Sequence, residues 1–193
     1  MTKVLLTGFE PFGTATSNPS GEIVKQISGD NIVTAILPVA YAGSAERLLA
    51  LIAEHNPDVV VCLGQAEGRT QITPEKVAIN LDDARLADNE GVLRNDVKIL
   101  DNGPDAYFTT LPIKEMVDTA KAVGVPASVS LSAGAFLCNH VFYVAQNNFA
   151  GTKVRSGFIH VPLMDSQAPE FPGMPTMPLD QMVKAVRAML EVL

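Results

Sequence analysis

The sequence predicts an α/β fold, a three-layer α/β/α sandwich with a mostly parallel, mixed sheet. Three observations predict this class. Short runs rich in β-branched residues alternate with segments of helical periodicity, which is typical of a parallel sheet covered by helices. The run Asp58–Leu63 is apolar without alternation, as expected of a strand covered on both faces. The length of 193 residues, without repeats or a linker, indicates one domain over residues 1–193.

The first part of the chain supplies strands and helices in alternation. Lys3–Thr7 is the first predicted strand. Asn18-Pro-Ser then offers an N-cap followed by proline at the first helical position, which starts a helix ending near Ser28. A second strand is expected at Asn31–Ala40. Ser44–His55 carries leucine and isoleucine on or near one face, which indicates a helix, and Asp58–Leu63 follows as the third strand.

The rest of the chain continues the alternation after a polar interruption. The stretch Asp82–Asp105 holds seven of the 21 acidic residues, and so long a loop is usually functional or a projecting arm. Five of the 13 prolines lie between Pro162 and Pro178, which implies an extended connection. Further strands are expected at Ile72–Ile79, Ala127–Leu131 and Gly157–Val161, and helices at Pro112–Gly124, Leu137–Phe149 and Leu179–Leu193.

Composition excludes several classes of function. The net charge of −7 argues against nucleic acid, because phosphate binding needs a basic face. No run reaches 18 apolar residues, so no membrane span is expected. The N-terminus lacks the apolar region of a signal peptide and the two cysteines form no disulfide pattern, so we expect a cytoplasmic, reduced protein. Charged residues make up 18%, against about 25% typically, which favours a homo-oligomer.

Cys138 is the strongest candidate for chemistry. It follows the predicted strand Ala127–Leu131 and lies at the N-terminus of the predicted helix Leu137–Phe149. The unpaired N–H groups and the dipole of a helix N-terminus favour negative charge, so we expect the thiolate to be stabilised there. A thiolate is a nucleophile for peptide or ester chemistry. The other cysteine, Cys62, lies in a strand-like run and is expected to be a small buried hydrophobe.

The three histidines differ in their suitability as a base for this thiol. His55 ends a predicted helix, where a cation is favourable, so a structural role is expected. His140 is two residues from Cys138 and would point in another direction on the same helix. His160 ends the strand Gly157–Val161, and in a parallel sheet strand ends and the following loops meet at one rim. Cys138 and His160 can therefore meet there; the alternative is a core cysteine and a buried, hydrogen-bonded histidine.

A carboxylate is expected to orient the imidazole, and spacing alone leaves Glu75, Asp82, Asp83 and Asp88 as candidates. The acids of the stretch 82–105 are expected to form a solvated face. Gly64-Gln-Ala-Glu-Gly68 fits neither the dinucleotide-binding nor the phosphate-loop pattern, and the clustered ligands of a metal site are absent from the sequence.

Four blocks of sequence resemble the pyroglutamyl peptidase I (pyrrolidone-carboxylate peptidase) family, in the family's order. The N-terminal signature is matched by Thr7-Gly-Phe-Glu-Pro-Phe-Gly13 with Asn18-Pro-Ser20. The glutamate motif is matched by Gly64-Gln-Ala66, Gly68-Arg69 and Ile72–Arg85 with Asp88-Asn-Glu-Gly91. The cysteine and histidine motifs are matched by Ser132–Tyr143 and Gly157–Pro162. The blocks span most of the chain; one departure is Glu67, where the family usually has glycine.

The resemblance implies a phosphorylase/hydrolase-like fold and a thiol peptidase that removes an N-terminal L-pyroglutamyl residue from peptides. Its catalytic residues would be Glu75, Cys138 and His160, with Arg85 and the backbone N–H of Cys138 supporting the oxyanion. The family is cytoplasmic, needs no metal or other cofactor, and commonly forms homotetramers. The positions that match the family's substrate pocket are Phe9, Phe12, Asn18, Gln65 and Phe136.

Two rival functions stay open at the level of sequence. One is a phosphate-dependent nucleoside-processing enzyme on a similar α/β scaffold, which would use Arg69 or Arg85 for phosphate and would not need Cys138. The other is a catalytically inactive binding module, whose thiol would not be selectively alkylated.

Overall fold

The computed structural model describes residues 2–193, which form an α/β fold around a five-stranded sheet with strand order β2-β1-β3-β7-β4. Strand β1 runs parallel to β2 and β3, and β3 runs parallel to β7, whereas β4 is antiparallel to β7. The predicted mostly parallel, mixed sheet is therefore confirmed. The strands are β1 (Val4–Phe9), β2 (Ile32–Leu37), β3 (Val59–Gln65), β4 (Thr73–Pro74) and β7 (Arg155–Val161).

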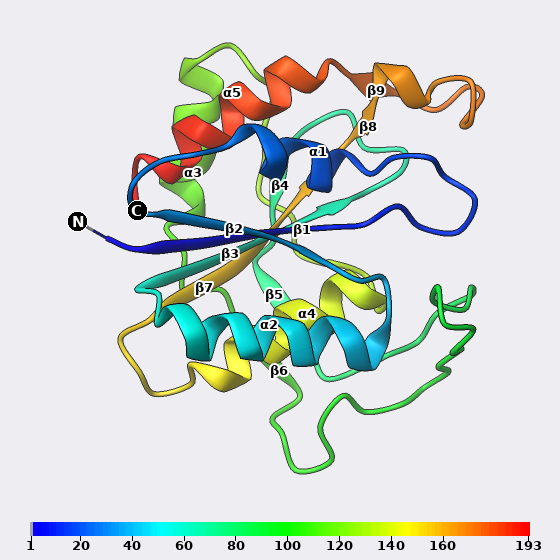
Figure 1. The fold of residues 1–193 in the computed structure, drawn as a ribbon, viewed down its shortest axis with the longest axis vertical. Helices are drawn as coiled ribbons and strands as arrows, with labels where there is room; N and C mark the ends of the chain where they lie inside the picture. The colour runs from blue at the N-terminus through cyan, green and yellow to red at the C-terminus, as the bar shows by residue number, and fades with distance from the viewer. Residues whose placement is uncertain (1) are drawn as a thin grey trace.

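Helices cover both faces of this sheet, as a three-layer sandwich requires (Figure 1). Helices α1, α3 and α5 lie on one face, and α2 and α4 lie on the other. The helices span α1 (Pro19–Gln26), α2 (Tyr41–His55), α3 (Ile113–Ala122), α4 (Leu137–Asn148) and α5 (Leu179–Leu190). The predicted last helix thus ends three residues early.

The side chains of the central strands alternate between two cores. In β3, Val59, Val61 and Leu63 join the core under α1, α3 and α5, whereas Val60 and Cys62 join the core under α2 and α4. Because successive residues of a strand point to opposite faces, a wholly apolar run fills both cores at once. The apolar pattern of Asp58–Leu63 therefore indicated its central place correctly.

The start of α1 follows the predicted capping chemistry. The side-chain oxygen of Asn18 accepts a hydrogen bond from the amide of Ser20 at 3.1 Å, and Pro19 occupies the first turn. The hydroxyl of Ser20 is in turn hydrogen-bonded by the amide of Phe9 at 3.0 Å. These contacts fix the end of β1 against the start of α1, so both segments reach the same edge of the sheet.

Two predicted strands were wrong in detail. The segment Ile72–Ile79 splits into β4 of the main sheet and β5 (Val77–Ile79) of a separate two-stranded sheet with β6 (Ala106–Phe108). Pro74 has no N–H to donate to a ladder, and the chain changes sheets immediately after it.

The predicted buried strand Ala127–Leu131 is instead an extended segment with isolated bridges from Ala127 to Ile72 and from Ser130 to Glu75. Leu131 is 74% exposed, so the apolar run does not mark burial on both faces. The segment lies beyond the short edge strand β4, where a covering layer on both sides is not required.

The remaining segments connect these layers. The polar stretch 82–105 is a long loop that projects beside the lower layer (Figure 1). A 3₁₀ turn, Asp165–Gln167, separates β8 (Leu163–Met164) from β9 (Thr176–Met177), which pair in parallel. Within residues 2–193 no helix has the length and apolar character that crossing a bilayer requires.

Candidate active site

His160 and Glu75 form a buried pair at the end of the central sheet. His160 lies one residue before the end of β7, opposite Gly64 of β3 and Thr73 of β4. Its Nδ1 is 2.7 Å from Oε1 of Glu75, which follows β4 directly. His160 is 4% exposed and Glu75 is 0% exposed. Since Nδ1 faces a carboxylate, it carries the ring proton in the neutral imidazole, and Nε2 is left to accept a proton.

Of the four carboxylates that the sequence left open, the geometry brings Glu75 to His160. Asp82 is also buried, but its Oδ2 contacts Nδ1 of His140 at 2.8 Å and Arg94 at 2.7 Å. Asp83 is exposed. Asp88 is 5% exposed and accepts backbone amides of Tyr41, Glu90 and Val92. The expectation that all the acids of this stretch are solvated was therefore wrong for Asp82 and Asp88, which hold the loop to the body of the protein.

Cys138 lies beside this pair. It is the second residue of α4, and its side chain is partly exposed. A Cβ atom placed on Gly64 would lie 2.7 Å from its Sγ, and Gly64 is the residue that pairs with His160 in the sheet. The thiol therefore rests on the backbone of β3 where that strand meets His160. In the sequence Gly64 was noted as part of the glutamate motif and of a loop without a phosphate-binding pattern, but not as a neighbour of the thiol.

The electrostatics of the site differ from the expectation for a helix N-terminus. Burial raises the pKa of the Cys138 thiol to about 12, the Glu75 carboxylate adds to that rise, and Arg69 opposes it. Burial also lowers the pKa of His160 from its usual 6.5, although contact with Glu75 works against this. These shifts favour a neutral thiol beside a neutral imidazole, and they run against the predicted stabilised thiolate.

A cavity of about 160 Å³ opens in front of Cys138. All five residues that match the family's substrate pocket line it, namely Phe9, Phe12, Asn18, Gln65 and Phe136. The rings of Phe12 and Phe136 pack at 5.4 Å between centroids, and the ring of Tyr41 stands edge-on to Phe136 at 5.7 Å. The cavity therefore has aromatic walls, and the ring of Phe136 is held in place by its contacts with Phe12 and Tyr41.

The polar groups of this cavity are held by neighbours. Gln167, which is fully buried, donates from Nε2 to Oε1 of Gln65 at 3.0 Å. That contact leaves the amide nitrogen of Gln65 to donate into the cavity. Asn18 uses its oxygen to cap α1 and its nitrogen to contact the carbonyl of Glu10 at 3.0 Å. Glu67 also lines the cavity. Gln167 was missed by sequence reasoning, since its partner lies 102 residues away.

The two predicted oxyanion groups lie in different places. The amide of Cys138 belongs to the first turn of α4, whose N–H groups have no partner within the helix. Arg85 is exposed and lines a neighbouring cavity with Phe12 and Phe136, apart from the cavity that Cys138 lines. The structure thus places the amide of Cys138 next to the thiol and Arg85 behind the aromatic wall.

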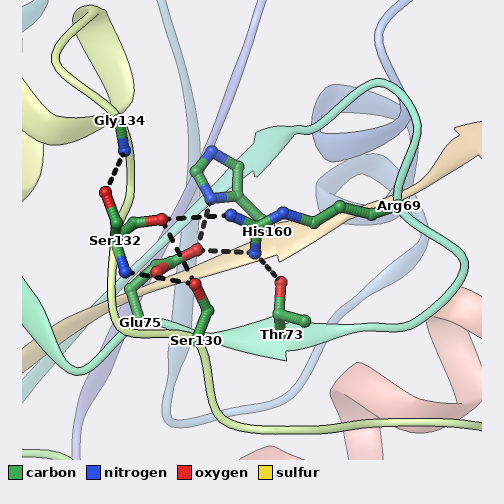
Figure 2. A network of polar contacts seen from close by, with 7 residues as sticks. All are labelled: Arg69, Thr73, Glu75, Ser130, Ser132, Gly134 and His160. Atoms are coloured by element: carbon green, nitrogen blue, oxygen red, sulfur yellow. Dashed lines mark hydrogen bonds and ion pairs between the residues drawn. The ribbon is translucent and has the colours of Figure 1, made fainter.

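Arg69 was considered in the sequence only as part of a motif and as a phosphate ligand of the rival enzyme, and its contact with Glu75 was missed. Its guanidinium donates to Oε1 of Glu75 at 2.7 Å and to the carbonyl oxygen of Ser132 at 3.1 Å, and it also contacts the hydroxyl of Thr73. Figure 2 shows the guanidinium between these groups, with the imidazole of His160 on the same carboxylate. The signal in the sequence was the position of Arg69 in the glutamate motif.

The other singled-out residues are not part of the Glu75–His160–Cys138 constellation, although Cys62 belongs to the core cluster against which Cys138 packs. His55 ends α2 as predicted, and Cys62 is fully buried in β3 as predicted. His140 contacts Asp82 and stacks edge-on with Tyr41 at 5.4 Å. No group of three or more histidine, cysteine, aspartate or glutamate side chains within residues 2–193 is arranged to hold a metal ion.

Comparison with known proteins gives one consistent result. The family model described as pyroglutamyl peptidase matches residues 2–193. A pyrrolidone-carboxylate peptidase of Aliivibrio fischeri is 47% identical over 191 residues, covering 96% of this chain and 90% of the relative. One of Bacillus thuringiensis is 44% identical, covering 100% and 93%.

Solved structures agree in fold as well as in sequence. The crystal structure of pyroglutamyl peptidase I from Bacillus amyloliquefaciens superimposes with a TM-score of 0.94 at 44% identity, covering 97% of this chain and 92% of that one. A mutant pyrrolidone carboxyl peptidase from Pyrococcus furiosus gives 0.91 at 38% identity, covering 98% and 97%. This chain therefore belongs to the pyroglutamyl peptidase family.

Proposed function

We propose that this protein is a cysteine peptidase that removes an N-terminal L-pyroglutamyl residue from peptides, with residues 1–193 as a single catalytic domain. The observation that carries the proposal is the buried Glu75–His160 pair beside Cys138, which in turn lines an aromatic cavity. Cys138 is the nucleophile, His160 the general base and acid, and Glu75 the carboxylate that orients the imidazole.

The first half of the reaction forms a thioester. Because the thiol and the imidazole are both neutral at rest, the proton of Cys138 passes to Nε2 of His160 as Sγ attacks the pyroglutamyl carbonyl carbon. The carbonyl oxygen becomes an oxyanion, which the amide of Cys138 is placed to stabilise; a preorganised donor of this kind is worth on the order of 3 kcal/mol. When the tetrahedral intermediate collapses, the C–N bond breaks and the imidazolium gives its proton to the leaving amine.

The second half releases the acid. A water molecule gives a proton to His160 as its oxygen attacks the thioester carbonyl. Collapse breaks the C–S bond, and His160 returns the proton to the sulfur. Glu75 accepts a hydrogen bond from Nδ1–H throughout and stays ionised, so the cation formed on the ring in each half has a buried counter-charge at 2.7 Å.

The cavity suits a five-membered lactam. The lactam has no free amine, so a selective site needs apolar faces and a few amide-type partners rather than an acidic side chain. Phe9, Phe12 and Phe136 supply the faces, and the oriented amide nitrogen of Gln65 supplies a donor for the ring carbonyl. We assign Asn18 chiefly to shaping the cavity, since its amide is engaged in capping α1.

Neither rival function is favoured. Arg69, one of the two residues that a phosphate-dependent enzyme would use, is engaged by Glu75 and Ser132. An inactive binding module would not require the buried acid–histidine pair to stand beside a thiol. Arg85 supports the oxyanion in this mechanism once its side chain turns from the neighbouring cavity toward Cys138.

We further propose a cytoplasmic homo-oligomer, a tetramer, that uses no metal or other cofactor. Two free thiols suit a reducing compartment. Large apolar side chains are exposed on the polar loop, at Leu86, Leu93 and Leu100, and elsewhere at Phe108 and Leu131, and burial of exposed apolar surface favours association. A mass near the 20.5 kDa of one chain in light scattering at micromolar concentration would contradict assembly. Loss of activity in EDTA that a divalent ion restores would contradict the metal-free mechanism.

The deciding experiment follows release of a fluorescent amine from its L-pyroglutamyl amide. Wild type should turn the substrate over and lose activity on alkylation. Cys138→Ser should abolish turnover, whereas the matched variant Cys62→Ser should keep most of it, because Cys62 is a core residue. Equal loss in both folded variants, or comparable kcat/KM for the prolyl amide, would refute the proposal.

A further inference from the structure

The side chain of Arg69 joins two parts of the site that are far apart in the chain. Its Nη1 lies 2.7 Å from Oε1 of Glu75, the same oxygen that faces Nδ1 of His160. Its Nη2 donates to the carbonyl of Ser132 at 3.1 Å. Ser132 begins the segment that leads into α4 and Cys138 (Figure 2). One guanidinium therefore holds the acid of the site on one side and the approach to the nucleophile on the other.

We propose that Arg69 is a positioning residue of this peptidase: it fixes the Glu75 carboxylate beneath His160 and ties it to the segment that carries Cys138. The proposal rests on the function assigned above and adds a fourth residue to it. Arg69 touches the acid rather than the reacting atoms, so its contribution passes through Glu75, His160 and the path of residues 132–138.

The burial of Glu75 explains why a cation is needed there. Its carboxylate is fully buried, and Oε2 has no hydrogen-bond partner among residues 2–193. A buried carboxylate is costly unless it is paired. His160 is neutral at rest and supplies only a hydrogen bond, so Arg69 supplies the positive charge. An arginine can do this while its second nitrogen holds Ser132, which the compact ammonium of a lysine does less well.

The charge of Arg69 also acts on both reacting groups. It lowers the pKa of the Cys138 thiol, against the larger effect of burial. It also lowers the pKa of His160, in the same direction as burial. Its removal should therefore raise both pKa values. Because the two move in the same direction, the whole pH dependence of thiol reactivity should move to higher pH, a change that a loosened loop alone would not produce.

The chain contains a closely matched control. Arg94 contacts Oδ2 of Asp82 at 2.7 Å, and that oxygen also faces Nδ1 of His140 at 2.8 Å. The Arg94 side chain is 29% exposed against 26% for Arg69, and both carboxylates are fully buried. Asp82 likewise keeps one oxygen, Oδ1, without a partner within residues 2–193. Loss of either arginine removes the cation that pairs with a buried carboxylate, but only Arg69 contacts the carboxylate of the Glu75–His160 pair beside Cys138.

The test compares wild type, Arg69→Met, Arg69→Lys and Arg94→Met. Two measurements are made from pH 5.5 to 9.5: the rate at which iodoacetamide alkylates Cys138, located by mass spectrometry, and kcat and KM for the pyroglutamyl amide. For Arg69→Met, the pH needed to reach a given alkylation rate should rise by about half a unit or more. Its kcat at neutral pH should fall at least about tenfold with KM little changed, whereas Arg94→Met should leave the alkylation profile in place.

Arg69→Lys separates charge from geometry. It should keep the alkylation profile near that of wild type because the charge remains, yet lose kcat because the tie to Ser132 is lost. Superimposable alkylation profiles for Arg69→Met and wild type, or an equal shift in Arg94→Met, would overturn the proposal. If Arg69→Met does not fold, an unchanged kcat in Arg69→Lys would overturn it instead. Alkylation needs no substrate, so a failure of the peptidase assignment would appear separately, as absent turnover in wild type.

Discussion

Nδ1 of His160 lies 2.7 Å from Oε1 of Glu75, although the two residues are 85 positions apart in the chain. The sheet creates this contact, because β4 runs antiparallel to β7 and delivers Glu75 just after its last residue. We expect Glu75→Gln to lose at least about 10²-fold in kcat with KM little changed. The comparable amide replacement in a serine triad costs about 10⁴, and a thiol requires less help to ionise. Steady-state kinetics on the pyroglutamyl amide measures the loss.

Asp82→Asn is the matched control for this change. Asp82 is also fully buried and also contacts the Nδ1 of a histidine, but that histidine is His140. Its kcat should stay within about tenfold, under roughly 1.4 kcal/mol of activation free energy. Asp83→Asn and Asp88→Asn should do the same. If Glu75→Gln were active and Asp82→Asn inactive, Asp82 of the polar loop would have to be the catalytic carboxylate instead of Glu75.

The sequence predicted what depends on local pattern. The alternation of strands and helices, the Asn18 cap and the place of His160 at a strand end all follow from residues near one another. Cys62 is a further case, because the short, β-branched apolar run Val59–Leu63 that contains it is typical of a strand covered on both faces.

What could not be predicted depends on pairing across the fold. The buried carboxylate of Asp82 is paired with His140, which is 58 residues away. The side-chain amide of Gln65 is oriented by Gln167, which is 102 residues away. The raised pKa of Cys138 has the same origin, since the helix N-terminus is visible in the sequence whereas the burial that outweighs it is not. For the same reason Ala127–Leu131 looked like a core strand: three of its five residues are apolar, but its position beyond the edge of the sheet depends on the tertiary fold.

The lowered pKa of His160 sets the pH dependence of activity. Burial keeps the imidazole neutral below its usual pKa of 6.5, so the base should stay competent in mild acid. We expect kcat/KM to fall only as the pH drops below 6.5, with the acidic midpoint under that value. A pH profile from 4.5 to 9 measures this, and an acidic midpoint above 6.5 would contradict it.

The same shift should appear in stability. The unfolded chain binds a proton at His160 near pH 6.5, whereas the folded chain does so only at lower pH, so more protons are bound on unfolding in that window. The free energy of unfolding should therefore decrease as the pH falls from above 6.5 toward the folded pKa. Urea titrations at pH 7.5 and 5.5 measure the decrease, which should be smaller in His160→Gln. An equal decrease in that variant would assign the effect to other groups.

Gln167 should control substrate affinity without touching substrate. It fixes the amide of Gln65 through a 3.0 Å hydrogen bond, and a freely rotating amide would present its oxygen as often as its nitrogen. We expect Gln167→Leu to raise KM several-fold with kcat changed less, a loss of about 1 kcal/mol in keeping with one hydrogen bond. Phe12→Ala should also raise KM by removing one face of the cavity. Unchanged KM in both variants would remove this cavity from substrate recognition.

Gly64 is the residue of β3 whose lack of a side chain makes room for the nucleophile. An added Cβ would lie 2.7 Å from Sγ of Cys138 and 2.7 Å from the ring of Phe158. Both distances are far below van der Waals contact, so Gly64→Ala must displace the thiol, the ring or the strand. Inserting a methyl group into a packed interior typically costs about 1–3 kcal/mol. Here the displaced atom is the one that must reach the substrate, and a misplacement of about 1 Å can cost about 10² in rate.

We therefore expect Gly64→Ala to lose at least about 10²-fold in kcat/KM, with a stability loss in the range of ordinary overpacking. Gly43→Ala is a suitable control, because its Cβ would meet the side chain of Pro38 at 3.2 Å, a contact that a small shift relieves, far along the chain from Cys138. Kinetics and thermal unfolding of both variants separate the two effects. A folded Gly64→Ala enzyme with kcat/KM within about threefold of wild type, under roughly 0.7 kcal/mol, would mean that Cys138 reacts from a position other than the one it occupies against β3.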